Sequence, residues 1–297
     1  MTDIIELPQG ADQGKPTQSN VLKPAVFKPT VNKPTVNKPT VNKPTVQSPA
    51  DAQPDRPSIF LAVPCYGCLM MNTFAASIIA LQALCAQRGI PIYMDFVGNE
   101  SLIERARNIL VKRFLQTTGF THFMFIDADI GFNPESVIRL LEFDKDVTSA
   151  VYPKKAINWD NVKQKIASGS QEDIRQMGLD FNINLISNQA PINGFVKVLD
   201  VATGFLMMKR GVLERMYKHY EKELFAVNDI QGQNVKDYIA IFACMIDPET
   251  KRFLSEDYAF CRRYQQMGGD IWADITTPLS HTGTHVFSGD IKERFTM

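Results

Sequence analysis

Apolar and polar positions divide the chain into a proline-rich segment and a longer region that alternates between strand and helix patterns. Residues 1–56 include a KPTVN repeat, with proline at every fifth position and few large apolar side chains. Proline lacks a backbone donor, fixes φ and disfavours helix at the preceding residue. We therefore predict a disordered, extended tail over residues 1–56. It serves as a solvated linker or docks a partner through its regularly spaced lysines.

From Ser58 onward, short β-rich runs alternate with segments that carry apolar residues at helical spacing. Strands are predicted within residues 58–64, 91–97, 122–129 and 146–153, and helices within residues 71–89, 101–119 and 133–143. The alternation predicts one α/β domain over residues 57–297, Rossmann-like, with a mixed and mostly parallel central sheet.

The second half of the folded region is less regular. Residues 156–195 are polar and receive no assignment, and two strands with a turn near Gly204 are predicted within residues 196–210. Further on, helices are predicted within residues 211–224 and 255–269, a strand at 270–275 and a loop at 278–285.

The composition narrows the classes of function. The chain has 297 residues, with 32 Lys and Arg against 32 Asp and Glu, so its formal net charge is zero. This balance argues against a protein that coats nucleic acid or an anionic membrane, and we expect no direct nucleic-acid partner. The five cysteines indicate reduced thiols, and neither a signal peptide nor a transmembrane segment is recognisable. We therefore expect a soluble, cytoplasmic protein.

The segment HFMFIDADIGF, residues 122–132, carries two carboxylates at the end of an apolar strand. Residues two apart in a strand point to the same side, so Asp127 and Asp129 are predicted to present their carboxylates together. Open α/β sheets bind ligands at the carboxyl ends of their strands. Two hard oxygen ligands at that edge suit Mg²⁺ or Mn²⁺, completed by water and phosphate oxygens. The alternative is a solvated turn in which one aspartate caps the next element.

Several segments together resemble nucleoside-diphosphate-sugar glycosyltransferases of the GT-A fold, in a family-2-like subset. The D-x-D segment FMFIDADIGFNPESV carries the resemblance, and the surrounding segments agree in order: FLAVPCYG, SLIERARNILVKRFL, VYPKK, ATGFLMMKR, SEDYAFCRR and SHTGTH. The resemblance implies a nucleotide-sugar-binding half at residues 57–155 and an acceptor or catalytic half at residues 156–297.

The reaction implied by the resemblance transfers a hexose or pentose from a nucleoside diphosphate donor to an acceptor hydroxyl. A cation offsets the charge that develops on the departing diphosphate. The resemblance implies Asp129 as a direct ligand of Mn²⁺ or Mg²⁺, and Asp127 as a residue that holds the ribose or reaches the metal through water. It also implies His281 as a third ligand, with His285 as its substitute. The acceptor, whether glycan, glycolipid or protein, stays open.

Two acids, Glu256 and Asp257, begin a predicted helix in the segment SEDYAF. In inverting members of the resembled class, an acid at this point is the general base that deprotonates the acceptor hydroxyl. Asp257 is the implied base, with Glu256 as its substitute. Serine and acids also favour a helix start through capping and the helix dipole, so a purely structural role is the alternative.

Further donor-binding candidates lie after the first strand, on the helix before the D-x-D segment and after the fourth strand. They are Pro64, Cys65, Tyr66, Arg105, Arg107, Asn108, Lys154 and Lys155. Tyr66 is expected to stack on the nucleobase, and the two arginines to grip phosphate or a base edge from the polar side of their helix. The lysines are expected to steady donor phosphate or acceptor. A solvated helix face, with Glu104 pairing the arginines, is the alternative.

Three other classes of function stay open. A Mg²⁺-dependent phosphohydrolase of the haloacid-dehalogenase type also uses D-x-D, but on its first strand and followed by threonine or valine, where this chain has Ile130. A glycoside hydrolase uses two carboxylates and ordinarily no diphosphate-binding cation. A catalytically inactive sugar-nucleotide-binding or scaffold protein would keep the fold. The combination of Asp127, Asp129, Asp257 and His281 argues against that last class.

Overall fold

A computed structural model of the protein describes residues 56–186, 189–229 and 235–284. Residues 1–55 of the predicted tail, with the KPTVN repeat, lie outside the described residues, and so does His285. Within the described ranges, no helix has the length and apolar character that crossing a bilayer requires.

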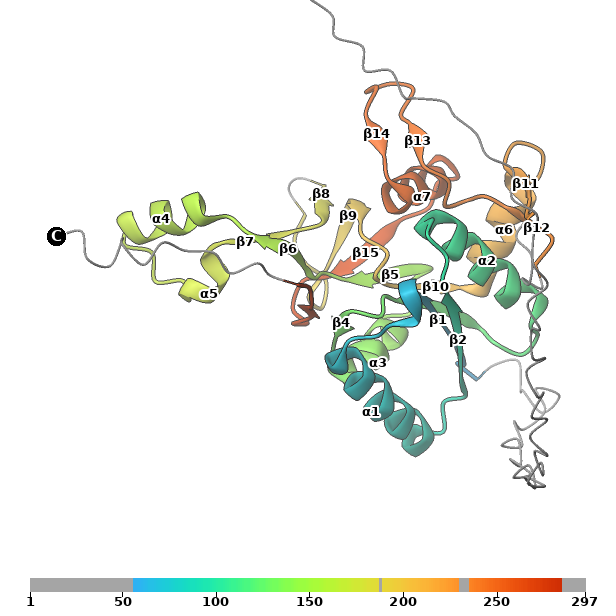
Figure 1. Cartoon of the computed structure of the whole chain (residues 1–297), viewed down its shortest axis with the longest axis horizontal. Coiled ribbons are helices and arrows are strands. Elements are labelled where there is room, and N and C mark those ends of the chain that lie inside the picture. The colour runs from blue at the N-terminus through green and yellow to red at the C-terminus, as the bar shows by residue number, and fades with distance from the viewer. Residues whose placement is uncertain (1–55, 187–188, 230–234, 285–297) are drawn as a thin grey trace, which may run out of the picture. The chain divides into compact units, whose positions relative to one another are not determined.

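The central feature is an eight-stranded sheet with the order β2-β1-β3-β10-β5-β15-β9-β8 (Figure 1). Its strands are β1 Ile59–Cys65, β2 Ile92–Gly98, β3 His122–Ile126, β5 Val147–Ala150, β8 Ile183–Leu185, β9 Phe195–Val201, β10 Phe205–Lys209 and β15 Ile271–Asp274. β1 runs parallel to β2 and β3, and β5 runs parallel to β15. β10 is antiparallel to β3 and β5, and β9 is antiparallel to β15 and β8. Six of the eight strands, all except β9 and β10, thus point in the same direction, which confirms the predicted α/β fold with a mixed, mostly parallel central sheet.

Helices cover both faces of this sheet, and the alternation of side chains along the strands explains why. In β1, Ile59 and Leu61 pack with α1 (Asn72–Arg88) and α3 (Pro134–Glu142). Phe60 of the same strand packs on the opposite face, in a core shared with α2 (Ile103–Gln116), α6 (Arg210–His219) and α7 (Glu256–Gln266). All seven residues of β1 and all five of β3 are buried, as expected for strands covered on both faces.

Local signals in the sequence account for several element boundaries. Asn133 caps α3 by accepting a 3.0 Å hydrogen bond from the backbone N–H of Glu135, with proline at the first helical position. Gly89 closes α1 in the left-handed conformation, at φ +62°. The predicted helices before and after β3 and the predicted strands of the first half all form.

The predicted strand pair within residues 196–210 forms as β9 and β10, but the two strands do not pair with each other. β9 lies between β15 and β8, whereas β10 lies between β3 and β5. Gly204 therefore connects two separated strands instead of closing a hairpin. The predicted loop at 278–285 contains a short strand, β16 (Ser280–His281), which pairs with β4 (Ile130–Gly131).

The polar stretch after β5, for which the sequence predicted no elements, forms helices and strands. Two helices, α4 and α5, lie in the chain between two strands, β6 and β7, that pair with each other (Figure 1). These are β6 Pro153–Ile157, α4 Trp159–Ala167, α5 Ile174–Met177 and β7 Leu179–Phe181. The remaining described elements are η2 Tyr66–Cys68, β11 Phe225–Val227, β12 Asp237–Ile239, β13 Met245–Ile246 and β14 Phe253–Leu254.

Candidate functional site

The D-x-D aspartates lie just beyond the carboxyl end of β3, because this strand ends at Ile126 and not at Asp129 as predicted. The N–H of Asp127 donates to the carbonyl of Gly204 at 3.0 Å, and the N–H of Ile130 donates to the carbonyl of Asp127 at 3.0 Å. The chain therefore turns at these residues before it enters β4. Since the aspartates are in a turn, their carboxylates have different partners and do not act as one pair.

Asp129 contacts Lys155 and His281. The Lys155 ammonium donates to Asp129 Oδ2, and His281 Nε2 lies 3.5 Å from Asp129 Oδ1. Asp129 Oδ1 itself is buried and has no hydrogen-bond partner. Burial alone would raise the pKa of Asp129, but the imidazole and the ammonium lower it overall. The carboxylate is therefore held in its charged form with one oxygen still able to bind a ligand.

His281 is held in place by the pairing of β16 with β4 and by a backbone carbonyl. In the β16–β4 pair, His281 lies opposite Ile130, and the neighbouring N–H of Thr282 donates to the carbonyl of Asp129 at 2.9 Å. The ring atom Nδ1 lies 2.9 Å from the carbonyl oxygen of Pro153. Since a carbonyl only accepts, Nδ1 carries the hydrogen, and in the neutral ring Nε2 presents a lone pair toward Asp129.

Two of the predicted metal ligands, Asp129 and His281, are thus brought together, but the described residues form no complete cage around a metal. Among the described residues, no group of three or more His, Cys, Asp or Glu side chains has a metal-binding arrangement. Mg²⁺ commonly takes only one or two protein carboxylates and completes its shell with water and substrate phosphate. The buried, unpartnered Oδ1 of Asp129 beside an imidazole nitrogen fits such an open site.

A cavity of about 430 Å³, which we call the aspartate cavity, opens beside these carboxylates. It is lined by Pro64, Cys65, Tyr66, Leu69, Met70, Met71, Val97, Glu100, Ser101, Ile103, Ala106, Asp127, Ala128 and Asp129. Three of the predicted donor-binding residues, Pro64, Cys65 and Tyr66, therefore share one cavity with both aspartates. The side chain of Tyr66 is 75% exposed, so its ring is free to contact a ligand.

The three candidates on α2 do not line this cavity. Arg105 forms a two-point ion pair with Glu100, with both nitrogen–oxygen distances at 2.8 Å. Asn108 bonds to the carbonyl of Glu104 at 2.8 Å and accepts from the N–H of Phe242 at 3.1 Å, so it holds the backbone together. Glu104 pairs with neither arginine in the described contacts.

Arg107 is buried, so the expectation that it lies on the polar side of its helix was wrong. Only 3% of its side chain is exposed. Its guanidinium lies between Asp127 and Glu256 and 4.9 Å from the ring centre of Phe125. Burial opposes its charge, but the two carboxylates outweigh that effect and raise the pKa of Arg107. The side chain stays cationic in the interior.

The acids at the start of α7 have distinct environments. Asp257 accepts hydrogen bonds from the hydroxyl of Ser255 and, at 2.8 Å, from the N–H of Tyr258. Glu256 points inward, with its Oε1 3.2 Å from Nε of Arg107. Burial raises the pKa of Glu256, although the positive charge of Arg107 opposes that rise. Of the two, Asp257 is the acid that is not committed to an ion pair in the described contacts.

Tyr152 and Gly204 belong to this site and were missed as site residues in the sequence. The N–H of Gly204 donates to the Tyr152 hydroxyl at 3.0 Å. A Cβ at position 204 would lie 2.8 Å from Asp127 Oδ2 and closer still to the Tyr152 hydroxyl. Only glycine therefore fits where β10 begins beside Asp127. The glycine of the segment ATGF was visible in the sequence. The reason for it was not, because Asp127 and Tyr152, which leave no room for a Cβ, are distant in sequence.

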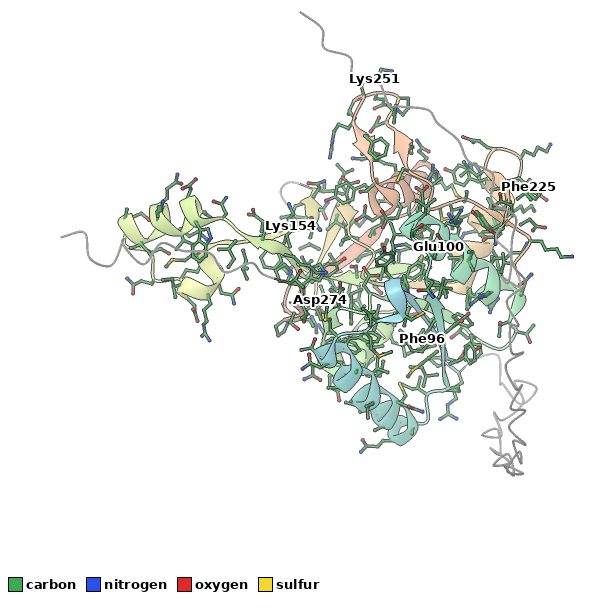
Figure 2. The ribbon with its side chains drawn as sticks, viewed as in Figure 1. Phe96, Glu100, Lys154, Phe225, Lys251 and Asp274 are labelled. Atoms are coloured by element: carbon green, nitrogen blue, oxygen red, sulfur yellow. The ribbon has the colours of Figure 1, made fainter. Side chains whose placement is uncertain are left out.

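The two lysines after β5 have different environments: Lys155 contacts the candidate site, and Lys154 lies at the surface. Lys155 contacts Asp129, and its aliphatic stem lies against Gly283. Lys154 is exposed and lies on β6 (Figure 2). Glu100, also marked in Figure 2, lines the aspartate cavity.

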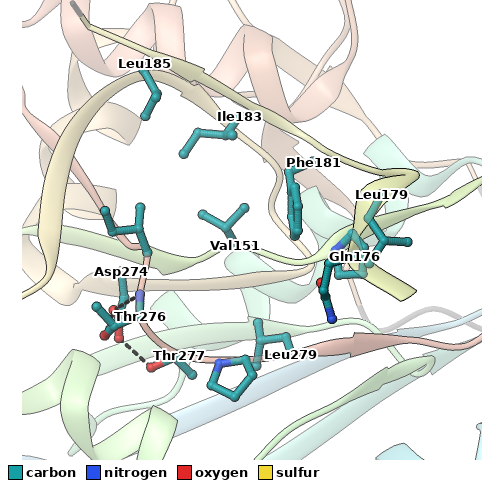
Figure 3. Close-up of a pocket in the computed structure, with 13 residues that line it drawn as sticks. Val151, Gln176, Leu179, Phe181, Ile183, Leu185, Asp274, Thr276, Thr277 and Leu279 are labelled. Carbon is teal, nitrogen blue, oxygen red and sulfur yellow. Dashed lines mark hydrogen bonds between the residues drawn. The ribbon is translucent and has the colours of Figure 1, made fainter. Parts of the chain in front are cut away.

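A second cavity of about 440 Å³, the apolar cavity, lies under β7 and β8 (Figure 3). Its lining residues are Val151, Pro153, Gln176, Leu179, Phe181, Ile183, Leu185, Asp274, Ile275, Thr276, Thr277, Pro278 and Leu279. Four of them, from Leu179 to Leu185, alternate with polar residues in the sequence LDFNINL, which is the pattern of a half-buried strand. This signal was present in the unassigned stretch. Most of this lining belongs to the half predicted to bind the acceptor.

Comparison with known proteins gives no family assignment. No protein-family description matches the chain, and neither does any curated protein. Among solved structures, the chain is similar to A197 from STIV, with 13% identity over 76% of this chain and 86% of that chain, at a TM-score of 0.44. It is also similar to GalNAc-T7, solved with UDP, GalNAc and Mn²⁺, with 9% identity over 77% of this chain and 44% of that chain, at a TM-score of 0.42. Because both TM-scores lie below 0.5, neither similarity assigns a function.

Proposed function

We propose that the protein is a metal-dependent glycosyltransferase with a GT-A-like domain over residues 57–297, preceded by a linker. It moves a hexose or pentose from a nucleoside diphosphate to an acceptor hydroxyl. The observation that carries this proposal is the pairing of Asp129 and His281 beside the aspartate cavity. Because Nδ1 donates to the carbonyl of Pro153, Nε2 is the ring atom that faces Asp129 Oδ1, and a proton or a cation between these two atoms would stabilise the contact.

Mn²⁺ or Mg²⁺ fits this position by the chemistry of its ligands. Asp129 and His281 would hold the cation, and Asp127 would hold the donor ribose or approach the cation through water. The cation, when bound, would offset the negative charge on the departing nucleoside diphosphate. Its shell would be completed by water and diphosphate oxygens, which explains why two protein ligands are enough.

The donor nucleoside is assigned to the aspartate cavity. Its volume of about 430 Å³ lies in the range of small-molecule sites, and it joins apolar walls to a few convergent carboxylates. Tyr66 is the ring that would stack on the base, with Pro64 and Cys65 forming the wall beneath. Lys155 would move from Asp129 to a phosphate oxygen as the donor arrives, and Lys154 stays as a second phosphate candidate.

Asp257 is the proposed general base, which makes the reaction inverting. Its carboxylate is oriented by Ser255 and by the start of α7, and it is not neutralised by an arginine in the described contacts. It would take the proton of the acceptor hydroxyl as that oxygen attacks the anomeric carbon. Glu256 is the poorer candidate because its carboxylate is committed to Arg107.

Thermal unfolding with and without ligand tests this proposal. UDP or GDP should raise the Tm only when Mn²⁺ or Mg²⁺ is present, and Asp129→Ala should abolish that rise. Asp160→Ala is the control, because the Asp160 side chain is 86% exposed on α4 and should leave the rise intact. An equal rise in Tm in the presence of EDTA would refute the metal site.

Product analysis then separates the classes of function. Incubation with diphospho-sugars and Mn²⁺ should release nucleoside diphosphate together with a glycosylated acceptor or free sugar. Release of inorganic phosphate from phosphomonoesters would instead identify a phosphohydrolase. Metal-dependent binding without any turnover would identify a sugar-nucleotide-binding protein that has lost catalysis.

A further inference from the structure

Arg107 joins three elements that each carry part of the candidate site. It belongs to α2, and its Nη1 and Nη2 lie 3.1 Å and 3.2 Å from the two oxygens of Asp127, just after β3. Its Nε lies 3.2 Å from Oε1 of Glu256, the first residue of α7. All three guanidinium nitrogens therefore face carboxylates, and the residue next to Glu256 is Asp257, the proposed base.

Arg107 compensates the negative charges of two carboxylates in the interior, in addition to packing against its neighbours. One buried guanidinium lies between two carboxylates, and its side chain is 3% exposed, against 24% for Asp127 and 13% for Glu256. The central carbon of the guanidinium lies over the Phe125 ring, 4.9 Å from the ring centre. Removing one partner from a buried ion pair leaves an uncompensated charge, so the positions of Asp127 and Glu256 depend on the same cation.

Arg107 does not line the aspartate cavity, so it has no direct access to a ligand bound there. It touches the site only through Asp127 on one side and Glu256 on the other. The fork geometry of arginine allows both contacts at once, whereas a lysine ammonium is a single point charge and would satisfy one carboxylate at a time.

We infer that Arg107 is a positioning residue that fixes Asp127 and the start of α7 relative to each other, and so aligns donor and base. This inference rests on the proposed glycosyltransferase reaction for its catalytic meaning. It gives Asp127 a role distinct from that of Asp129, since the Arg107 contact directs Asp127 inward while Asp129 faces His281. It also replaces the predicted role of Arg107 as a donor ligand.

The test has one arm that needs no knowledge of the reaction. Unfolding by urea is measured for Asp127→Asn, Glu256→Gln and the double variant, first with Arg107 and then with Arg107→Met. The two carboxylates should be coupled when Arg107 is present, so that the effects of the single variants do not add. The coupling should vanish in the Arg107→Met background. Additive effects in both backgrounds would refute the inference, whatever the protein binds.

A second arm measures Mn²⁺-dependent UDP binding by calorimetry. Glu256 lies outside the aspartate cavity, yet Glu256→Gln should weaken binding several-fold when Arg107 is present and not at all after Arg107→Met. Arg107→Lys should bind UDP about tenfold more weakly than wild type, while Tm falls less than for Arg107→Met. A residue that only stabilises the fold would change Tm and leave the affinity of the folded protein unchanged.

Arg263→Lys is the matched control, because Arg263 is also buried but donates, among the described residues, to the backbone carbonyls of Ile241 and Ala243 and to no carboxylate. It should lower Tm without changing UDP affinity or the coupling between Asp127 and Glu256. If wild type binds no nucleotide in the presence of Mn²⁺, the proposed function fails, and the urea arm still decides whether Arg107 couples the two acids. Equal losses of UDP affinity for Arg263→Lys and Arg107→Lys would overturn the positioning role.

Discussion

The aspartate cavity and the apolar cavity lie at the same edge of the sheet, and each has an aspartate at a strand end. The first opens beyond the carboxyl ends of β1 and β3, the second beyond those of β5 and β15. Open α/β sheets place ligands at this edge, so location alone favours both cavities equally. The difference between them lies in the bonding of their acids.

Asp129 and Asp274 show that difference. Asp274 is fully buried, and its oxygens accept from Arg139 Nε at 2.6 Å, from the backbone N–H and hydroxyl of Thr276, and from the hydroxyl of Thr277. Asp129 is 28% exposed, and its Oδ1 has no hydrogen-bond partner. An acid with every oxygen occupied holds the fold together, whereas an acid with an unused oxygen beside a cavity can bind a ligand. This contrast is the basis on which we assign Asp274 a structural role and propose a ligand-binding role for Asp129 at the same sheet edge.

Removing Asp274 should have the largest effect on stability. Asp274→Ala leaves the hydrogen-bond donors of Thr276 and Thr277 without their partner, and we expect the free energy of unfolding to fall by about 3 kcal/mol. The part of this loss that comes from Arg139 is small, because its side chain is 38% exposed and regains water. Chemical unfolding of wild type and Asp274→Ala at neutral pH measures the total fall in the free energy of unfolding. Mn²⁺-dependent UDP binding by the folded fraction should persist, and its loss would contradict the separation of the two cavities.

The pH dependence of this effect has a definite sign. Burial alone would raise the pKa of Asp274, but the Arg139 ion pair and the threonine hydrogen bonds lower it overall. A lowered folded-state pKa means that the stabilisation is present above the ordinary range of aspartate and is lost as the pH falls through the folded-state value. The stability difference between wild type and Asp274→Asn should therefore shrink in acid. A difference that stays constant down to the acid transition would contradict this assignment.

The next largest loss of stability should come from a methyl group added at Gly204. Gly204→Ala places a Cβ against Asp127 Oδ2 and the Tyr152 hydroxyl, both in a packed region, and overpacking of this kind costs about 1–3 kcal/mol. Because Asp127 must move, UDP binding in the presence of Mn²⁺ should weaken as well. Gly211→Ala is the control, since a Cβ there meets only the far end of Arg215 at 3.4 Å. Equal Tm and affinity for the two variants would contradict the close packing at Gly204.

Features of the molecule that depend on local sequence could be predicted, and features that depend on distant residues could not. The alternation of strands and helices was predictable because its periodicity is local and strong, as in the five buried residues of β3 and the capping Asn133. The D-x-D position was predictable for the same reason. The end of β3 at Ile126 was not, because it depends on the carbonyl of Gly204, which is distant in sequence.

Other features of the site escaped prediction for a related reason. A charged residue within a helical pattern is expected to face water, and Arg107 is buried only because Asp127 and Glu256 converge on it from distant segments. The orientation of His281 likewise depends on the carbonyl of Pro153. In the stretch LDFNINL, the alternation was present, but the surrounding polar residues hid it. Long-range polar partners, and not local propensity, decide these details.

Removal of the ammonium beside Asp129 should have a smaller effect, and it should strengthen Mn²⁺ binding where the preceding variants lose stability or UDP affinity. Lys155→Met frees Asp129 Oδ2, and because both side chains are partly exposed their pairing contributes at most about 1 kcal/mol. Mn²⁺ should then bind a few-fold more tightly in the absence of nucleotide, as measured by titration calorimetry. Lys154→Met, at the neighbouring exposed position, should leave Mn²⁺ affinity unchanged. Weaker Mn²⁺ binding by Lys155→Met would mean that the lysine supports the metal site and does not compete with the cation.

The smallest effect should come from the apolar cavity itself. Leu185 is 62% exposed although its strand pattern is that of a core residue, so Leu185→Ala should lower the free energy of unfolding by less than about 0.5 kcal/mol. UDP binding with Mn²⁺ should not change, because Leu185 lines the apolar cavity and not the aspartate cavity. Chemical unfolding and calorimetry measure the two quantities. A loss of about 2–5 kcal/mol, the range for a buried leucine, would mean that this wall is covered in solution, and the two cavities would then differ in accessibility as well as in charge.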